Sequence, residues 1–280
     1  EMGYGNAINA LSENEGGVAK YFSQRFAQVT NPPLDSIREA DGMTLRVALG
    51  EKPHLGQSRS RQSVVNSPIL RMADVLKIKA QTVTPWDRFD LLYSAVFDDG
   101  PANEAALIDA IDAVADEVVA FARDRGGIAI LTDRHVSTDR AAMPMTLAVS
   151  AINQRLIEEG VRFKVSLVVE SGQIASSHHI CCALGFGAAA VYPLAVRARA
   201  EATFGDNATE AFFKYKKAAE KAIMMTMGKV GLCTVECYSG GEVFEPNFLD
   251  TSDRVFAKYL PNMTSPVGGV RFNVVAQSVA

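Results

Sequence analysis

The feature that most constrains this chain is an alternation of short apolar runs with amphipathic segments, which takes over from residue 102. The runs 128–132, 163–170 and 188–192 are apolar along nearly their whole length, as parallel strands buried on both faces are. Apolar side chains at helical spacing mark the segments around them. These predicted helices are 102–124, 144–159, 174–184, 194–229 with a break near 205–207, and 252–260. The alternation predicts an α/β fold with a parallel sheet covered by helices, as a barrel or an open sheet.

We predict a single domain over 1–280, because no segment resembles a linker long enough to divide the chain. Residues 1–76 are expected to be mainly helical, and 77–280 to carry the β/α alternation. In the first part we place a helix over 16–29 and another from the Ser67-Pro68 pair to about residue 76. Further strands are expected at 79–84, 90–97 and 232–237.

Composition excludes several classes of protein. The chain has 48% hydrophobic and 21% charged residues and a formal charge of −4. Nucleic acid and anionic membranes are therefore not expected partners, and no apolar run is long enough to span a bilayer. Four cysteines without a disulfide-like arrangement indicate a reducing, cytoplasmic location; we expect Cys233 and Cys237 to be buried on one strand face. The first residue is Glu1 rather than methionine, which suggests an excised piece of a larger protein.

A rigid corner is predicted where two prolines follow the helix over 16–29. Pro32 and Pro33 cannot continue a helix, so the chain must turn at Thr30 and Asn31 before Asp35 or Ser36 caps the next helix. A stiff polar corner between two helices is suited to lining a passage or holding a neighbouring domain. The alternative is a simple helix–helix connector.

Polar residues also follow the predicted strands. Asp133, Arg134 and Glu170 fall at strand carboxyl ends, where α/β proteins build their sites. Together with His178 they could support acid–base chemistry; alternatively, these groups pair with one another and with loop backbone.

Two further motifs contain groups that could bind a ligand. The histidines and cysteines of 178–182 place only two ligands on one helix face, whereas zinc needs three or four. The turn at 239–241 (SGG) follows a predicted strand and could hold a phosphate or a flavin, or be only a turn.

The residues carry a family resemblance over nearly the whole length. The block 26–33 (FAQVTNPP) resembles the signature near the start of the central domain of glutamate synthase large subunits. Further blocks match in order: Met2-Gly3, Ser67-Pro68-Ile69-Leu70, Ile130-Leu131-Thr132-Asp133-Arg134, Val168-Val169-Glu170-Ser171-Gly172, His178-His179, Leu184-Gly185-Phe186-Gly187-Ala188 and Lys229-Val230-Gly231. Segments 191–194 (VYPL) and 237–242 (CYSGGE) depart from the family pattern, which suggests a divergent subfamily.

The resemblance implies a degenerate (β/α) TIM-barrel-like domain that connects a glutaminase domain to an FMN domain. The parent enzyme makes glutamate from glutamine and 2-oxoglutarate by reductive amide transfer, and ammonia crosses an internal tunnel. By this resemblance, the residues expected to line the tunnel are Thr30, Asn31, Ala27 and Met2. FMN and the 3Fe–4S cluster belong to the parent enzyme, with no cofactor in this chain. The isolated domain is expected to be inactive.

Two rival functions remain: a stand-alone binding or scaffold module, and a small flavin-binding oxidoreductase that uses the turn at 239–241.

Overall fold

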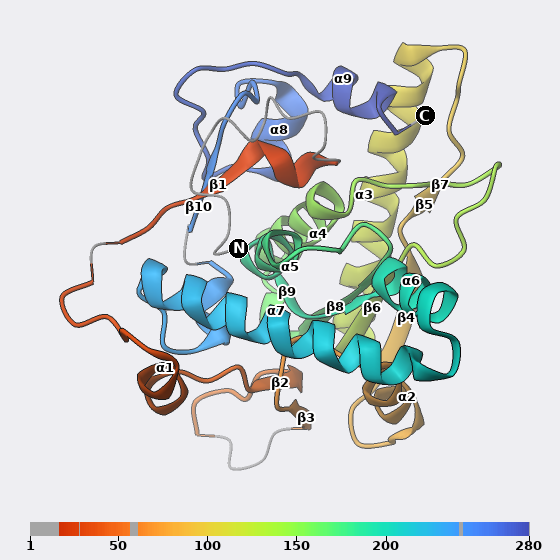
Figure 1. The fold of residues 1–280 in the computed structure, drawn as a ribbon. Coiled ribbons are helices and arrows are strands. Elements are labelled where there is room, and N and C mark those ends of the chain that lie inside the picture. Colours follow the sequence, from red (N-terminus) through yellow and green to blue (C-terminus); the bar gives the residue numbers. More distant parts are fainter. Residues whose placement is uncertain (1–16, 28, 57–60, 241–242, 280) are drawn as a thin grey trace.

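The centre of the molecule is a parallel sheet of four strands (Figure 1). A computed structural model describes residues 17–27, 29–56, 61–240 and 243–279. The strands lie in the order β4-β6-β8-β9. Their bounds are Trp86–Asp90 for β4, Gly127–Thr132 for β6, Val165–Ser171 for β8 and Ala188–Pro193 for β9. Every residue of β6 and β8 is buried, which explains why most of their side chains are apolar. The α/β fold with a parallel sheet is confirmed.

The register places the strand carboxyl ends at one edge of the sheet. Thr132 of β6 pairs with Glu170 of β8, and Glu170 pairs with Tyr192 of β9. On the outer side of β9, Ile69 forms a single parallel bridge with Val191. The segment around Ser67-Pro68 therefore extends the sheet and does not begin a helix there; helix α2 begins at Met72 and ends at Ala80.

Long helices connect the strands and cover the sheet. Between β4 and β6 lies α3 (Gly100–Asp124), which Asp99 caps by accepting a hydrogen bond from the Ala102 N–H at 3.0 Å. Between β6 and β8 lies α4 (Met145–Glu158), and between β8 and β9 lies α5 (Ser177–Gly185). The apolar side chains expected to face the core, such as Leu107, are buried. These helices confirm the predicted periodicity.

After β9 the chain forms α6 (Leu194–Phe204), a 3-10 turn η4 (Gly205–Asn207) and α7 (Ala208–Val230). This confirms the helical stretch with its predicted break. In Figure 1, α7 crosses the front of the molecule below the sheet, so one of its long sides is open to solvent.

In the part of the chain that the structure describes, three two-stranded antiparallel sheets and several short helices complete the fold. The pairs are β1 (Phe22–Gln24) with β10 (Phe244–Pro246), β2 (Val47–Gly50) with β3 (Gln62–Val65), and β5 (Leu92–Tyr93) with β7 (Ala141–Ala142). The short helices are α1 (Ser36–Gly42), α8 (Arg254–Tyr259) and α9 (Phe272–Gln277), with 3-10 turns η2 (Val18–Tyr21), η3 (Arg162–Lys164) and η5 (Val235–Tyr238).

The helix predicted over 16–29 is wrong for the described part of that segment. Residues Val18–Tyr21 form one 3-10 turn, strand β1 follows, and residues 25–27 and 29–35 are irregular. The cause is a long-range pairing: Phe22 lies opposite Pro246, and its ring packs on Phe186 with centroids 4.7 Å apart. The described part of 1–76 is therefore not mainly helical.

Two predicted strands are also wrong. Residues 79–84 hold the end of α2 and a loop, and the strand lies at β4 instead. The segment 232–237 makes one parallel bridge, between Thr44 and Thr234, and then turns into η5. Because no strand forms there, Cys233 and Cys237 are exposed rather than buried. The predicted strand over 90–97 is reduced to β5.

Candidate functional site

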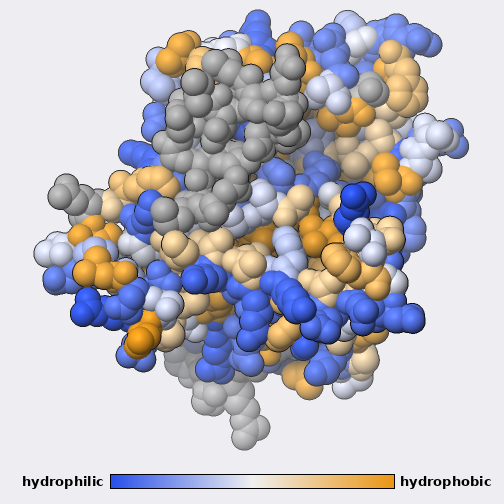
Figure 2. All heavy atoms as spheres, in the orientation of Figure 1, coloured by the Kyte–Doolittle hydropathy of each residue, from blue (hydrophilic) through white to orange (hydrophobic). Residues whose placement is uncertain are grey.

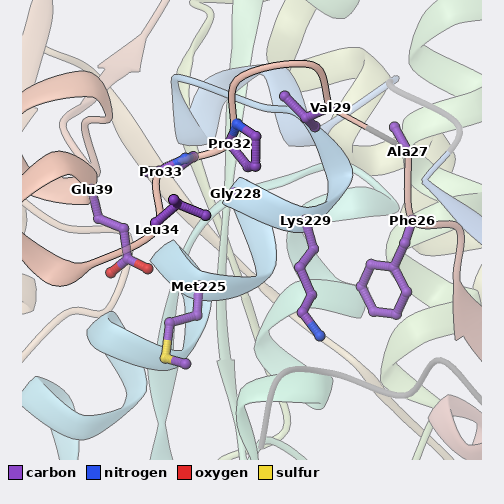
Figure 3. A pocket seen from close by; sticks show the side chains of 10 residues that line it. All are labelled: Phe26, Ala27, Val29, Pro32, Pro33, Leu34, Glu39, Met225, Gly228 and Lys229. Carbon is purple, nitrogen blue, oxygen red and sulfur yellow. The ribbon is translucent and has the colours of Figure 1, made fainter.

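The proline corner lies on the carboxyl end of α7. Thr30 and Asn31 form a bend in an irregular segment between β1 and α1, and both are exposed. The corner is therefore not the end of a broken helix, and free helix carbonyls at Thr30 cannot be part of its chemistry. In Figure 3 the segment carrying Pro32 and Pro33 passes close to the helix at Gly228.

Two glycines of α7 permit this close approach. A Cβ on Gly228 would lie 3.2 Å from Cγ of Pro33, which is closer than ordinary contact. Gly231 ends the helix in the left-handed conformation with φ of 84°, and a Cβ there would lie 3.3 Å from a methyl carbon of Val29. The segment thus rests on bare backbone at the point where α7 leaves its last carbonyls without intrahelical partners.

Packing the segment on the helix leaves two grooves, which we call the first and second corner grooves. The first has a volume of about 490 Å³ and is largely apolar, with Lys229 placed 5.3 Å from the ring centroid of Phe26. Figure 3 shows its lining side chains around α7. The second has a volume of about 510 Å³ and is lined by Thr30 and Asn31 together with Met43, Met227 and Leu232. Both grooves are lined in part by Pro32, Pro33 and Gly228.

The far side of the corner is fixed by α1. Asp35 caps this helix by accepting hydrogen bonds from the Ile37 and Arg38 N–H groups at 3.0 and 2.9 Å. The predicted cap is therefore present. Leu34 and Ile37 are three-quarters exposed, and Figure 2 shows hydrophobic side chains gathered over the segment that leads into α1. Exposed apolar side chains beside a groove are typical of an interaction surface.

The four residues predicted to line a tunnel divide as follows. Thr30 and Asn31 line the second corner groove, and Ala27 lines the first. Met2 lies outside the described residues. Gly228, Met225 and Met227 complete the grooves but were not predicted as site residues. The available signal was a glycine inside a long helical pattern, which is unfavourable unless another chain segment packs there.

The strand-end residues form a separate cluster. Oε1 of Glu170 accepts hydrogen bonds from the Thr132 hydroxyl at 2.9 Å and from Nε of Arg134 at 2.8 Å. Burial of Glu170 opposes its ionisation, but the bond and charge of Arg134 outweigh it and lower the pKa of this carboxyl. The same ion pair raises the pKa of Arg134. The carboxylate is therefore held ionised.

Asp133 accepts three hydrogen bonds in a second network at the same edge of the sheet. Its carboxylate accepts from the Ser171 hydroxyl at 2.6 Å, the Gly172 N–H at 2.8 Å and the Gln173 amide at 3.3 Å. These bonds join the loop after β6 to the loop after β8. An ionised Glu170 and a fully bonded Asp133 favour pairing over proton transfer, so the contacts fit the structural interpretation of this cluster.

His178 lies elsewhere. Its Nε2 is 2.9 Å from the Ala19 carbonyl oxygen and 3.4 Å from Sγ of Cys182, and its ring packs near Phe244. The structure thus brings together Asp133, Arg134 and Glu170 and directs His178 towards the N-terminal turn. Burial raises the pKa of Cys181 to about 11, which makes its thiol a poor nucleophile.

Two further predictions bear on cofactors and location. Within the ranges that the structure describes, no three His, Cys, Asp or Glu side chains are grouped as metal ligands. The turn at 239–240 follows the 3-10 turn η5 and not a strand of the parallel sheet, so the premise for flavin binding there is wrong. None of the described helices combines the length and apolar character needed to cross a bilayer.

Comparison with known proteins identifies the family. The family model for the glutamate synthase central domain matches residues 1–248. The chain belongs to this family. The central domain is 32% identical to the glutamate synthase [NADH] of Saccharomyces cerevisiae over 294 residues, covering 99% of the chain and 14% of that protein. It is 30% identical to the glutamate synthase [NADPH] large chain of Bacillus subtilis, covering 99% of the chain and 18% of the relative.

A third relative is the ferredoxin-dependent glutamate synthase of Cyanidium caldarium, 31% identical over 97% of the chain and 18% of the relative. The central domain therefore spans less than a fifth of the length of these curated relatives. Among solved structures, a mandelate oxidase mutant with a monooxide FMN adduct aligns with 85% of the chain and 92% of its own, at 12% identity and a TM-score of 0.42. At that score the alignment adds nothing to the fold described above.

Proposed function

We propose that this central domain joins the glutaminase domain of a glutamate synthase to its FMN domain and lines the ammonia route between them. The observation that carries the proposal is the corner: Thr30 and Asn31 are exposed, on a stiff segment, beside a groove at the end of α7. Residues 29–33 of the block that resembles the family signature line one wall of this groove.

The chemistry of the groove suits ammonia. Ammonia is small, neutral and both donates and accepts hydrogen bonds, as do the Thr30 hydroxyl and the Asn31 amide. Most of the surrounding wall is apolar, with Met43, Met227 and Leu232 beside the charged Arg38. A neutral molecule passes such a wall more easily than an ion, which would lose its hydration. Two prolines fix the position of the polar pair.

The remaining parts of the reaction are assigned to other domains. In this proposal FMN and the 3Fe–4S cluster bind to other domains of the enzyme, since the chain corresponds to less than a fifth of the length of its relatives. The exposed Leu34 and Ile37 then contact a neighbouring domain of the same enzyme. The three relatives, named for NADH, NADPH and ferredoxin, are similarly identical to the chain, so the central domain serves the step common to them all.

The test is uncoupling in the full enzyme. Asn31→Trp fills the second corner groove, so glutamine hydrolysis should continue while glutamate formation from glutamine falls several-fold. The matched control is Asp41→Trp, since residue 41 lies near the end of α1, is exposed and lines neither corner groove. Equal loss of both activities in Asn31→Trp, or loss of neither, contradicts the proposal. Equal uncoupling by the control variant contradicts the assignment to this groove.

A further inference from the structure

A separate polar groove lies between α2 and α7, well away from the corner. Its volume is about 810 Å³, larger than either corner groove, and within the range of small-ligand sites. Its floor includes Ile69 and Ile78, which are buried. Its charged side chains come from both walls: Arg71, Asp74 and Lys77 from the α2 side, and Lys216, Lys217 and Glu220 from α7.

Four of these six charges are neutralised in pairs. Arg71 donates two hydrogen bonds to Asp74, from Nε to Oδ2 at 3.0 Å and from Nη2 to Oδ1 at 3.1 Å. Lys216, only 8% exposed, forms an ion pair with Glu220. Burial opposes the ionisation of Asp74, but Arg71 and the charge of Lys216 lower its pKa. Both ion pairs therefore hold charged side chains in fixed positions along the sides of the groove.

Lys77 and Lys217 remain without a carboxylate. Among the described residues neither ammonium group forms an ion pair; Lys217 instead lies over the ring of Phe213, 5.1 Å from its centroid. The groove thus holds two unneutralised positive charges in a chain whose formal charge is −4. A local excess of this sign in a hollow of the surface concentrates anions.

We propose that the α2–α7 groove binds a small ligand through a phosphate group. A phosphate dianion matches the two unpaired ammonium groups in charge, and its oxygens accept hydrogen bonds from several donors at once. The fixed Arg71–Asp74 and Lys216–Glu220 pairs limit the space beside it and keep the lysines from pairing internally. Phe213, 42% exposed at the rim, offers an apolar surface to the rest of the ligand.

This site is independent of the proposed ammonia route. It lies along residues 213–220 of α7, whereas the corner grooves are built on residues 225–233. Failure of one proposal leaves the other intact.

The experiment is a calorimetric titration of the 280-residue chain with inorganic phosphate at constant ionic strength. We expect saturable binding of phosphate with a dissociation constant below about 10 mM. Lys77→Gln and Lys217→Gln should each weaken it about tenfold, as loss of one charge-assisted hydrogen bond does. Lys221→Gln is the matched control: the same charge change, exposed, on the same helix and outside the groove.

The control should bind phosphate within twofold of the unchanged chain. Absence of saturable binding, or unchanged affinity in both groove variants, overturns the proposal. An equal loss in Lys221→Gln shows binding to the general charge of α7 and also overturns it. Titration with glutamate separates the two anion chemistries, since equal binding of a carboxylate contradicts the phosphate assignment.

Discussion

Removing Arg134 tests whether the strand-end cluster is a structural ion pair. The side chain of Glu170 is only 2% exposed, and its Oε1 receives hydrogen bonds from Arg134 and Thr132. Its Oε2 is buried and has no hydrogen-bond partner among the described residues. Arg134→Met therefore leaves a buried carboxylate with one hydroxyl donor. Breaking a fully buried pair costs about 3–5 kcal/mol. Because the Arg134 side chain is 43% exposed, water replaces part of its effect, and we expect a loss of about 2 kcal/mol at pH 7.

The loss should depend on pH with a definite sign. The pKa of Glu170 is lowered in the folded chain, so its ion pair stabilises the fold above the unfolded-state pKa of about 4.3 and ceases to do so as pH falls through the folded-state pKa. In Arg134→Met the buried carboxyl has lost its cation, so its pKa rises on folding and protonation relieves the penalty. The difference between the two proteins should therefore shrink as pH falls from 7 towards 4.

The assay is urea denaturation followed by far-UV circular dichroism at pH 7 and at lower pH values. Arg38→Met is the control, because the Arg38–Asp35 pair is exposed and should change stability by no more than about 0.5 kcal/mol. If Arg134→Met is no more destabilising than the control, or if its effect is the same at every pH, the carboxylate is not held by this pair.

Three further variants probe the core by urea denaturation. The Tyr238 hydroxyl is buried near the side chains of Cys181 and Gln24 but forms no well-aligned hydrogen bond among the described residues, so Tyr238→Phe should change the free energy of unfolding by less than about 0.5 kcal/mol. The Tyr259 hydroxyl lies 3.2 Å from Asp112, so Tyr259→Phe should lower the free energy of unfolding by about 1 kcal/mol. A comparable loss at both positions contradicts this. Gly185→Ala would place a Cβ 2.3 Å from the Phe244 ring, so it should cost about 1–3 kcal/mol despite its better helix propensity; a stabilised variant means the ring moves freely.

Local patterns predicted the parallel part of the fold well. The strands β6 and β8 are apolar because both their faces are covered, and the cap at Asp35 depends only on neighbouring residues. Such features need no knowledge of distant segments. The N-terminal turn was mispredicted because Phe22 pairs with Pro246, more than two hundred positions away. The spacing of apolar residues in this segment fits a helix, but it does not reveal that the Phe22 ring packs on Phe186.

The candidate site shows the same limit. The sequence indicates a stiff polar turn at Thr30, since prolines act locally, but it does not show that the turn rests on α7. That contact depends on Gly228 and on packing between segments about 200 residues apart. Likewise, Glu170 and Arg134 meet because their strands are neighbours, whereas α5 directs His178 to Ala19. Position at the carboxyl ends of the strands therefore predicted the first grouping, whereas closeness in sequence failed to predict where His178 lies.

The most direct test of the ammonia route is a labelling competition in the full enzyme. Glutamate is formed from glutamine carrying ¹⁵N in its amide, in the presence of excess unlabelled ammonium, and the ¹⁵N content of the product is measured by mass spectrometry. If Thr30 and Asn31 line a closed route, the unchanged enzyme yields glutamate that keeps the label, and Asn31→Trp yields glutamate in which the label is diluted. Equal label retention in both enzymes, or dilution already in the unchanged enzyme, contradicts a conduit at this corner.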